Sequence, residues 1–383
     1  MTPRERLLKT LDHQVPDRVP IDLGGYQTGI HRKAYENLLE HFEIEDETEI
    51  LDCVQQLAVP CEELLQRFHV DIRYIWSKGS DSFDGTIRQN RRRGKLWHDF
   101  TDEFGVVWSM ADDQKLYMDI SHHPLADVTM EELKERPFPN GGDKTRFTGV
   151  REKALRIRKQ SSYAISTTIG GSMYEYSWYQ RGLERWFIDM IENPGFCEVL
   201  LDKMLVFWKD YYVGYMGEVG DLVDVVQIGD DVAGQHGPMF SPEFYRSIIK
   251  PRLKELIRHI KSLTSAKIWY HTCGGCTELI PDLIECGIDI LNPIQISATN
   301  MNPKELKEKF GSEVVLWGGA CDTQHLLPFA SPEEVAKEVC KNMEIFKAGG
   351  GYVFNNVHNI QADVPVENII AMFDAAYKCG FYT

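Results

Sequence analysis

Short apolar runs alternate with longer amphipathic segments along most of this chain of 383 residues. The runs are mostly apolar and rich in β-branched residues, as expected for strands that are covered on both faces. They lie at Val19–Leu23, Ile72–Trp76, Tyr163–Thr168, Val223–Ile228, Lys267–Tyr270, Asp289–Leu291, Val314–Trp317 and Tyr352–Asn355. Apolar residues at helical spacing fill most of the intervals between these runs.

The helical segments carry start signals. Ser241 precedes a predicted helix at Pro242–Leu263, and Ser331 precedes a proline and two glutamates, which places acidic residues at the positive end of the next helix. A last helix is predicted at Pro365–Tyr377. Strands that are each followed by helical material predict an α/β protein with a closed (β/α)8 TIM-type barrel. A doubly wound open sheet is the alternative.

Residues 80–143 interrupt this alternation. Within them, the runs TIRQNRRRG and KLWHDFTDEFGVVW mix polar with aromatic residues and indicate antiparallel strands. We therefore expect an antiparallel insertion after the second strand, which caps one end of the barrel. No linker or internal repeat divides the sequence, so residues 1–383 are predicted to form a single barrel domain.

Composition and charge narrow the classes of partner. The formal net charge of −16 argues against nucleic-acid and anionic-membrane partners, which favour basic surfaces. The first residues lack the apolar core of a signal peptide and no stretch approaches a membrane span, so a cytoplasmic location is expected. The nine cysteines are then predicted to be reduced thiols. The oligomeric state is left open, a homodimer included.

Polar side chains collect at the ends of the predicted strands, where barrels of this kind carry their active sites. Candidate residues are Asp22 after the first strand, Lys78 after the second, and Asp230, Asp231 and Gln235 after the fourth. Asp230 and Asp231 could act as an acid–base pair or hold a substrate cation. Alternatively, Asp231 caps the following loop and Asp230 pairs with an arginine.

The sharpest local feature is the pair His271-x-Cys273 at the end of the fifth predicted strand. Residues two apart on a strand point to the same side, so the imidazole and the thiol could hold one ion. Nitrogen and sulfur ligands favour zinc, and a catalytic zinc has three protein ligands. His358 and Cys321, at the ends of two other strands, are candidates for the third ligand. Alternatively, His271 bonds a backbone carbonyl and Cys273 is a small buried apolar residue.

Several long segments resemble the uroporphyrinogen decarboxylase superfamily, and they imply a TIM-type barrel. They read ERLLKTLDHQVPDRVPIDLGG, GDDVAGQHGPMFSPEFYRSIIKPRLKELI, YHTCGGCTELIPDLIECGIDILNPIQ, WGGACDTQHLLPF and GGGYVFNNVHNIQADVPVENI. Decarboxylases of that superfamily carry an RQAGRY motif near the start and an FSDIL motif after the second strand. Here the first place reads IDLGGYQTG, and Lys78 stands where the catalytic aspartate of the second motif falls. Decarboxylation of a porphyrinogen is therefore not what the resemblance implies.

The segments resemble more closely the branch of zinc-dependent methyltransferases that exchange methyl groups with a corrinoid protein. The signature of that branch is His-x-Cys with a distant Cys near the last strand, and His271 and Cys273 match its first part. Aligning the shared Pro-x-Glu-Asn element at Pro365 places His358 where the distant Cys falls. This departure puts the third ligand in doubt, and Cys321 could supply the sulfur instead.

The resemblance implies transfer of a methyl group from a small donor to the cob(I)alamin of a separate corrinoid protein. The donor expected is a methoxylated aromatic, which an anaerobe would O-demethylate, with Zn2+ acting as a Lewis acid; a thiol acceptor is the near variant. Asp230 or Asp231 would protonate the leaving oxygen. The residues expected to line the substrate pocket are Trp76, Tyr174, Tyr176, Trp178 and Gln235. The alternatives are a metal-free lyase, with proton transfer by Asp22, Lys78 and the pair Asp230–Asp231, and a binding partner of a corrinoid protein without activity.

Overall fold

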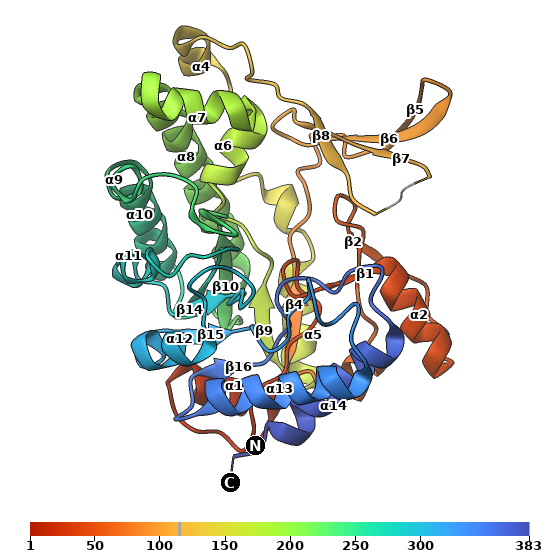
Figure 1. Ribbon diagram of the computed structural model, residues 1–383. Coiled ribbons are helices and arrows are strands. Elements are labelled where there is room, and N and C mark those ends of the chain that lie inside the picture. Colours follow the sequence, from red (N-terminus) through yellow and green to blue (C-terminus); the bar gives the residue numbers. More distant parts are fainter. Residues whose placement is uncertain (114–115, 383) are drawn as a thin grey trace.

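The centre of the molecule is a curled parallel sheet (Figure 1). The computed structural model describes residues 1–113 and 116–382, and in this part of the chain seven strands are hydrogen-bonded side by side. Their order is β16 (Tyr352–Val353), β15 (Val315–Trp317), β14 (Ile290–Asn292), β13 (Lys267–His271), β10 (Val225–Gly229), β9 (Ala164–Thr167) and β4 (Ile72–Ile75). Each strand begins and ends within two residues of its predicted bounds. The sheet and its helices confirm the α/β class and the TIM-type barrel.

The first predicted strand, Val19–Leu23, is not a regular strand. Ile21 forms a single parallel bridge with Phe354 on one side. On the other side, the Ile21 amide donates to the carboxylate of Asp71 at 2.8 Å, and the Ile21 carbonyl accepts from the Asp71 amide at 2.8 Å. Pro20 has no amide hydrogen to donate, and the Ile21 amide is bound by the Asp71 side chain instead of a backbone carbonyl. The backbone hydrogen bonds between strands therefore cannot extend along this segment. The segment nevertheless lies between β16 and the start of β4.

Side chains fill the bore of the barrel. Fully buried Trp269 and Trp317 meet edge to face there, with ring centroids 6.5 Å apart. Leu7 and Leu11 of the first helix belong to the same apolar cluster. The bore is therefore a packed core, and a small molecule can reach this barrel only at its ends.

Helices surround the sheet, as the alternating pattern predicts (Figure 1). They are α1 (Pro3–Leu11), α2 (Arg32–Phe42), α3 (Glu62–Arg67), α4 (Met130–Glu135), α5 (Val150–Gln160), α6 (Tyr174–Arg181), α7 (Leu183–Glu192), α8 (Pro194–Val219), α9 (Pro242–Phe244), α10 (Lys250–Lys261), α11 (Ile280–Cys286), α12 (Pro303–Phe310), α13 (Pro332–Lys347) and α14 (Val366–Cys379), with a short 3-10 turn at Lys144–Phe147. No helix among the described residues combines the length and the apolar character needed to cross a membrane.

The helix predicted at Pro242–Leu263 is interrupted. A π-helical turn at Tyr245–Ile249 separates α9 from α10. Pro251 is the second residue after this turn, and a proline cannot donate the backbone hydrogen bond that an α-helix requires at that position. The Ser331 start is confirmed, because Ser331 and Glu334 form a reciprocal capping box at the start of α13.

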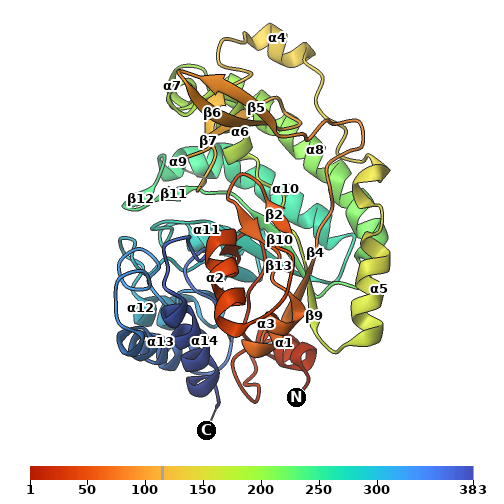
Figure 2. The same cartoon turned by 90° about the vertical axis from the view of Figure 1, so that its right-hand side faces the viewer.

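The insertion between β4 and α5 is an antiparallel sheet, as expected (Figure 2). Its strands in the described residues are β5 (Arg88–Arg92), β6 (Lys95–Thr101), β7 (Val107–Ala111) and β8 (Asp119–His122). Figure 2 shows β5, β6 and β7 above the barrel. Trp108 of β7 contacts Tyr179 of α6 edge to face, with ring centroids 5.1 Å apart. The insertion thus packs against a helix that begins at the barrel end.

Smaller antiparallel pairs lie outside the barrel. β1 (Ile30–His31), β3 (Leu57–Ala58) and β2 (Ile50–Asp52) form one small sheet, and β11 (Ala233–Gly234) and β12 (Gly237–Pro238) form a hairpin after β10. Whether residues 1–383 behave as a single domain stays a prediction.

One prediction about the cysteines is wrong. Cys340 on α13 and Cys379 at the end of α14 form a disulfide, with their Cα atoms 5.5 Å apart. The two cysteines are 39 positions apart in the sequence, and the packing of α13 against α14 brings them together. Cys273, Cys276 and Cys321 are free thiols.

Candidate metal centre at the barrel mouth

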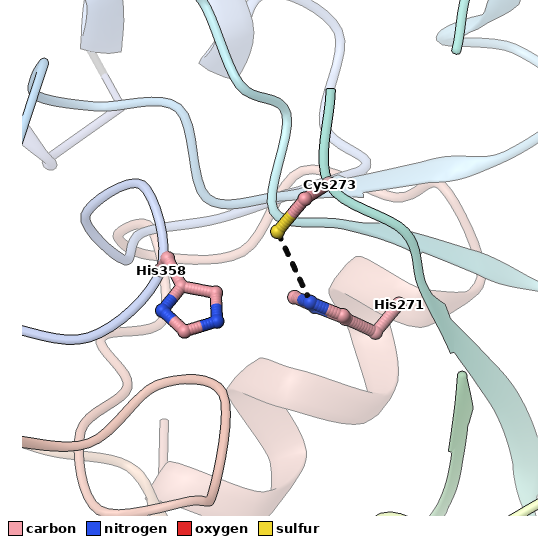
Figure 3. Close-up of side chains that lie close together, drawn as sticks. All are labelled: His271, Cys273 and His358. Atoms are coloured by element: carbon pink, nitrogen blue, oxygen red, sulfur yellow. Dashed lines mark hydrogen bonds between the residues drawn. The ribbon is translucent and has the colours of Figure 1, made fainter. Parts of the chain in front are cut away.

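His271, Cys273 and His358 meet at the C-terminal end of the sheet (Figure 3). His271 is the last residue of β13, and Cys273 follows two residues later on the same side. The Cys273 Sγ lies 3.4 Å from the His271 Nε2, and the rings of His271 and His358 are 5.5 Å apart. One ligand atom from each residue lies within 4.8 Å of the other two. The three side chains can therefore reach a single ion.

The loop that carries His358 is held in an uncommon conformation. His358 has φ of 61°, in the left-handed region that few non-glycine residues adopt. The Asn356 side-chain amide donates to the His358 carbonyl, and the neighbouring Asn359 accepts from Gly29 at 2.7 Å and donates to the Tyr26 carbonyl at 2.8 Å. Side-chain amides thus hold a backbone conformation that presents the imidazole to His271, and such strain is common at functional sites.

The orientation of His271 is set by Asn292 at the end of the neighbouring strand β14. The Asn292 Nδ2 donates to the Trp317 carbonyl at 3.0 Å, which directs the Oδ1 of the same amide toward the His271 Nδ1 at 2.7 Å. The proton of the neutral imidazole must then sit on Nδ1, because Oδ1 only accepts. The Nε2 lone pair is left to face Cys273, as in metal sites with an outer partner on the histidine.

We predict that Asn292→Ala lowers metal affinity about 10- to 100-fold, because the tautomer and the ring orientation of His271 are no longer fixed. Competition with a chromophoric chelator measures the affinity. Asn342→Ala is the matched control, since Asn342 is also buried and its amide also donates to a backbone carbonyl, that of Ala320. Equal loss of affinity in both variants would contradict the assigned role of Asn292.

Burial sets the protonation of the three side chains. It lowers the pKa of His271 to about 4 and that of His358 to about 4, so both imidazoles are neutral near pH 7 and able to bind a metal. Burial and the negative charges of Asp231 and Glu175 raise the pKa of the Cys273 thiol well above its usual value. A cation beside the thiol would reverse that effect. Two imidazoles and one thiol, largely shielded from water, suit zinc in charge and softness.

Asp231 stands beside these ligands. Its Oδ1 lies 3.6 Å from the His271 Nε2 and accepts from the Cys273 amide at 2.7 Å, while its side chain keeps 34% of its exposure. Burial is the main cause that raises the pKa of Asp231. The carboxyl group therefore faces both the ligands and solvent.

Asp230 has a different position from its neighbour. Its carboxylate accepts from Ser172 Oγ at 3.0 Å and from the amides of Met173, Tyr174 and Glu175 at 2.9, 2.6 and 2.7 Å. These amides open α6, so the carboxylate caps the positive end of that helix. Burial raises the pKa of Asp230 to about 6. All of its acceptor positions are engaged, which suits a residue that positions α6. The alternative interpretation, in which Asp230 pairs with an arginine, is wrong, because Ser172 and backbone amides are its partners.

Glu175 is a residue to which the sequence analysis assigned no role. It follows β9, and its Oε1 accepts from Tyr179 Oη at 2.9 Å. Burial, followed by the charges of Asp231 and Asp230, raises its pKa well above the usual value. Its position after a barrel strand was the available signal. The Asp230 carboxylate determines where Glu175 lies, because it directs the start of α6 toward the barrel mouth.

Asp22 lies inside the barrel. Its carboxyl group accepts from Trp317 Nε1 at 2.9 Å and from Tyr74 Oη at 3.0 Å, and burial raises its pKa to about 7. Asp22 and Asn292 both contact Trp317, which connects Asp22 to His271 through two residues. Asp22 therefore lies below the candidate metal centre and supports the position of His271 through Trp317 and Asn292.

Several predicted residues lie away from the three ligands. Cys321 is buried, is not part of the His271 group, and its thiol points to the Asp322 carbonyl at 3.8 Å. Lys78 is half exposed and forms an ion pair with Asp81 at 2.5 Å. Cys321 and Lys78 each contact a partner on their own loop. These contacts compete with a role of either side chain at the barrel mouth.

The predicted pocket residues divide into two groups. Tyr174 is fully buried against Trp186 and Phe240. Trp76 lines a groove of about 800 Å³ between α3 and α5, with Lys153 Nζ 3.6 Å from its ring centre. The roles of Tyr174 and Trp76 in a substrate pocket stay predictions.

Tyr176 and Trp178 lie on α6, and Gln235 lies in the turn between β11 and β12. The rings of Tyr176 and Trp178 both contact Tyr179, at 5.5 and 4.3 Å between centroids, and all three rings keep partial exposure. Gln235 donates to the Ser297 carbonyl at 2.7 Å and accepts from Gln295 at 2.9 Å, so it ties two loops together.

The parallel barrel, with a polar cluster at the C-terminal ends of its strands, defines an α/β-barrel enzyme. Residues 126–379 match the family described as uroporphyrinogen decarboxylase (URO-D). Because this match covers well over half of the sequence, the chain belongs to the uroporphyrinogen decarboxylase family.

Individual relatives and a solved structure agree with this family. A uroporphyrinogen decarboxylase of Ruthia magnifica subsp. Calyptogena magnifica is 28% identical over 261 residues, which cover 65% of this chain and 70% of the relative. One from Pseudomonas syringae pv. syringae is 25% identical, and the match covers 49% of this chain and 50% of the relative. A methyltransferase from Methanosarcina mazei superposes with a TM-score of 0.63 at 17% identity, covering 99% of both chains. At that identity the superposition shows a shared fold.

Proposed function

We propose that this chain is a metal-dependent methyltransferase that moves a methyl group from a small donor to the cob(I)alamin of a separate corrinoid protein. The observation that carries the proposal is the group of His271, Cys273 and His358, whose ligand atoms lie within 4.8 Å of one another at the barrel mouth. The superposition on a methyltransferase over the whole chain supports it. The donor class inferred from the sequence is a methoxylated aromatic.

The residues present fit a zinc ion. His271 presents Nε2, because Asn292 occupies the other ring nitrogen at 2.7 Å. Cys273 supplies sulfur, and His358 is the third donor in place of Cys321. Zinc bound there would supply Lewis acidity toward a donor oxygen or a thiol sulfur. With three protein donors, one position is left for the substrate.

Carboxyl groups of this chain can supply the proton that the reaction requires. When the methyl–oxygen bond of the donor breaks, its electron pair would stay on the oxygen of the leaving group, while the reduced corrinoid of the partner protein, when bound, would supply the electron pair for the new bond to the methyl carbon. The oxygen then takes up one proton. Asp231, which lies 3.6 Å from the His271 Nε2, faces the same point as the ligands and is placed to deliver that proton. Asp230 instead positions α6, because its carboxylate oxygens already accept hydrogen bonds from the start of that helix.

A metal-free lyase is the alternative, and the names of the sequence relatives favour it. That chemistry would need Asp22, Lys78 and the pair Asp230–Asp231 to transfer protons. Asp22 is fully buried beneath the site, whereas Lys78 is exposed and paired with Asp81. The two side chains therefore lie in different environments.

The test is formation of methylcobalamin from a methoxylated aromatic in the presence of a corrinoid protein, followed by its absorbance. We expect turnover with zinc-loaded protein and a decrease of more than about 100-fold in Cys273→Ser or after removal of zinc by a chelator. Cys276→Ser is the matched control, since Cys276 is a buried free thiol outside the ligand group. Undiminished activity of metal-free protein, or carbon dioxide release from a carboxylated substrate, would favour the lyase.

A further inference from the structure

A short segment of the insertion, residues 116–118 between β7 and β8, contacts the small sheet of β1, β2 and β3. The Leu116 carbonyl lies 3.3 Å from the His31 Nε2, and the Met118 amide donates to the Val54 carbonyl at 2.9 Å. His31 belongs to β1, and Val54 lies in the turn between β2 and β3. The insertion is therefore fastened to a part of the chain that precedes β4.

Tyr117, the middle residue of this segment, connects the insertion to the loop that carries His358. The Tyr117 Oη donates to the Gln55 Oε1 at 3.0 Å, and the Asn359 Nδ2 donates to the same oxygen at 3.0 Å. An amide oxygen has two lone pairs, so Gln55 can accept from both donors at once. Asn359 is buried and directly follows His358 in the sequence. Two hydrogen bonds thus lead from the insertion to the residue beside a candidate ligand.

Asn359 is bound on every side. Its Oδ1 accepts from the Gly29 amide at 2.7 Å, and its Nδ2 also donates to the Tyr26 carbonyl at 2.8 Å. Its own carbonyl accepts from the Gln361 Nε2 at 3.1 Å. The left-handed backbone of His358, with φ of 61°, persists only if surrounding contacts hold it, and a buried donor left without its acceptor favours a different arrangement. The contact of Asn359 with Gln55 is one of these supports.

The Tyr117 phenol is suited to this contact. Burial raises the pKa of Tyr117 above its usual value, and the negative charges of Asp52 and of an ionised Cys273 act in the same direction. The phenol therefore keeps its proton near pH 7 and stays a hydrogen-bond donor. The same effect places Tyr117 within electrostatic reach of Cys273, on the side of the candidate metal centre from which the His358 loop comes.

We propose that Tyr117 is a positioning residue of the metal centre, which acts through Gln55 to hold the loop of His358 in the geometry that binds an ion. This inference rests on the proposed function, because the ion that His358 would hold is the one at which the methyl donor would bind. It gives the insertion a second role besides covering the end of the barrel. Removal of the Tyr117 hydroxyl would weaken the site while all three ligands remain.

Zinc affinity of the full chain, measured by competition with a chromophoric chelator, tests the inference together with the visible absorption of the cobalt(II)-loaded protein. We expect Tyr117→Phe to lower the affinity about 3- to 10-fold, which is less than the loss of a ligand's direct partner causes, and to shift the cobalt bands. Tyr35→Phe is the matched control, because the Tyr35 hydroxyl on α2 also donates to a side chain, that of Asp46 at 2.7 Å. It should change neither measurement.

Variants of Gln55 test the route. Gln55→Glu keeps an acceptor for both donors and should retain the parent affinity, whereas Gln55→Leu should lower it at least as far as Tyr117→Phe. Because the two residues act in series, the double variant of Tyr117→Phe and Gln55→Leu should bind zinc as Gln55→Leu does.

Unchanged affinity and cobalt bands in both Tyr117→Phe and Gln55→Leu would overturn the inference, and so would losses that add in the double variant. The parent protein separates this failure from a failure of the proposed function. A parent that binds zinc while these variants behave like it contradicts the role of Tyr117 alone, whereas a parent that binds neither metal contradicts both.

Discussion

His271→Ala should purify with almost no zinc, whereas the parent protein should hold roughly one zinc per chain. The substitution removes the one imidazole whose orientation is fixed by a neighbouring strand, through Asn292 at 2.7 Å. Two donors would remain, and they come from segments that are far apart in the sequence. We expect affinity to fall by more than about 100-fold, which exceeds the effect of losing an outer partner alone. Elemental analysis after dialysis measures it.

Three further variants identify the third ligand. His358→Ala should lose the metal as His271→Ala does, because the His358 ring faces His271 at 5.5 Å. His358→Cys should retain it, since a thiolate is an equally good zinc ligand. Cys321→Ala should keep its full zinc content, because the Cys321 thiol is outside the ligand group. Loss of zinc in Cys321→Ala together with retention in His358→Ala would reverse the assignment, and retention in all variants would exclude a metal at this place.

Asp71→Ala should destabilise the fold by about 3 to 5 kcal/mol, the usual cost of removing one partner from a buried ion pair. The Asp71 carboxylate binds Arg6 at 2.6 Å and Arg18 at 2.8 Å, and all three side chains are buried. It also accepts from the Ile21 amide at 2.8 Å. Its loss would leave two guanidinium groups without a full set of acceptors and would free the segment that lies between β16 and β4.

The midpoint of urea-induced unfolding measures this loss. Asp374→Ala is the matched control, because Asp374 also binds an arginine, Arg67, at 2.7 Å, but the two side chains are 50% and 38% exposed. An exposed pair of this kind contributes less than about 1 kcal/mol. Similar midpoints for the two variants would show that the Asp71 cluster does not hold the barrel together.

Most of the barrel could be predicted from the sequence because strands that are buried on both faces need continuous apolar runs. The exception is the segment at Val19–Leu23, which is as apolar as the others. Its pairing depends on the Asp71 side chain, some 50 positions away, and no local pattern reports such a partner. The Cys340–Cys379 disulfide was missed for the same reason, since it depends on how α13 packs against α14.

At the mouth, the sequence by itself determined that His271 and Cys273 lie together, because two residues on one strand end share a side whatever the rest of the chain does. Only the tertiary structure decided what surrounds them. The left-handed turn at His358 brings its ring beside His271, and Cys321 faces its own loop. Asp230 and Asp231 are adjacent in sequence, yet one caps α6 and the other faces the ligands. The two adjacent residues differ because the donors to the Asp230 carboxylate lie at the start of α6, whereas the donor to Asp231 is the Cys273 amide after β13, and only the tertiary structure brings these segments to the two side chains.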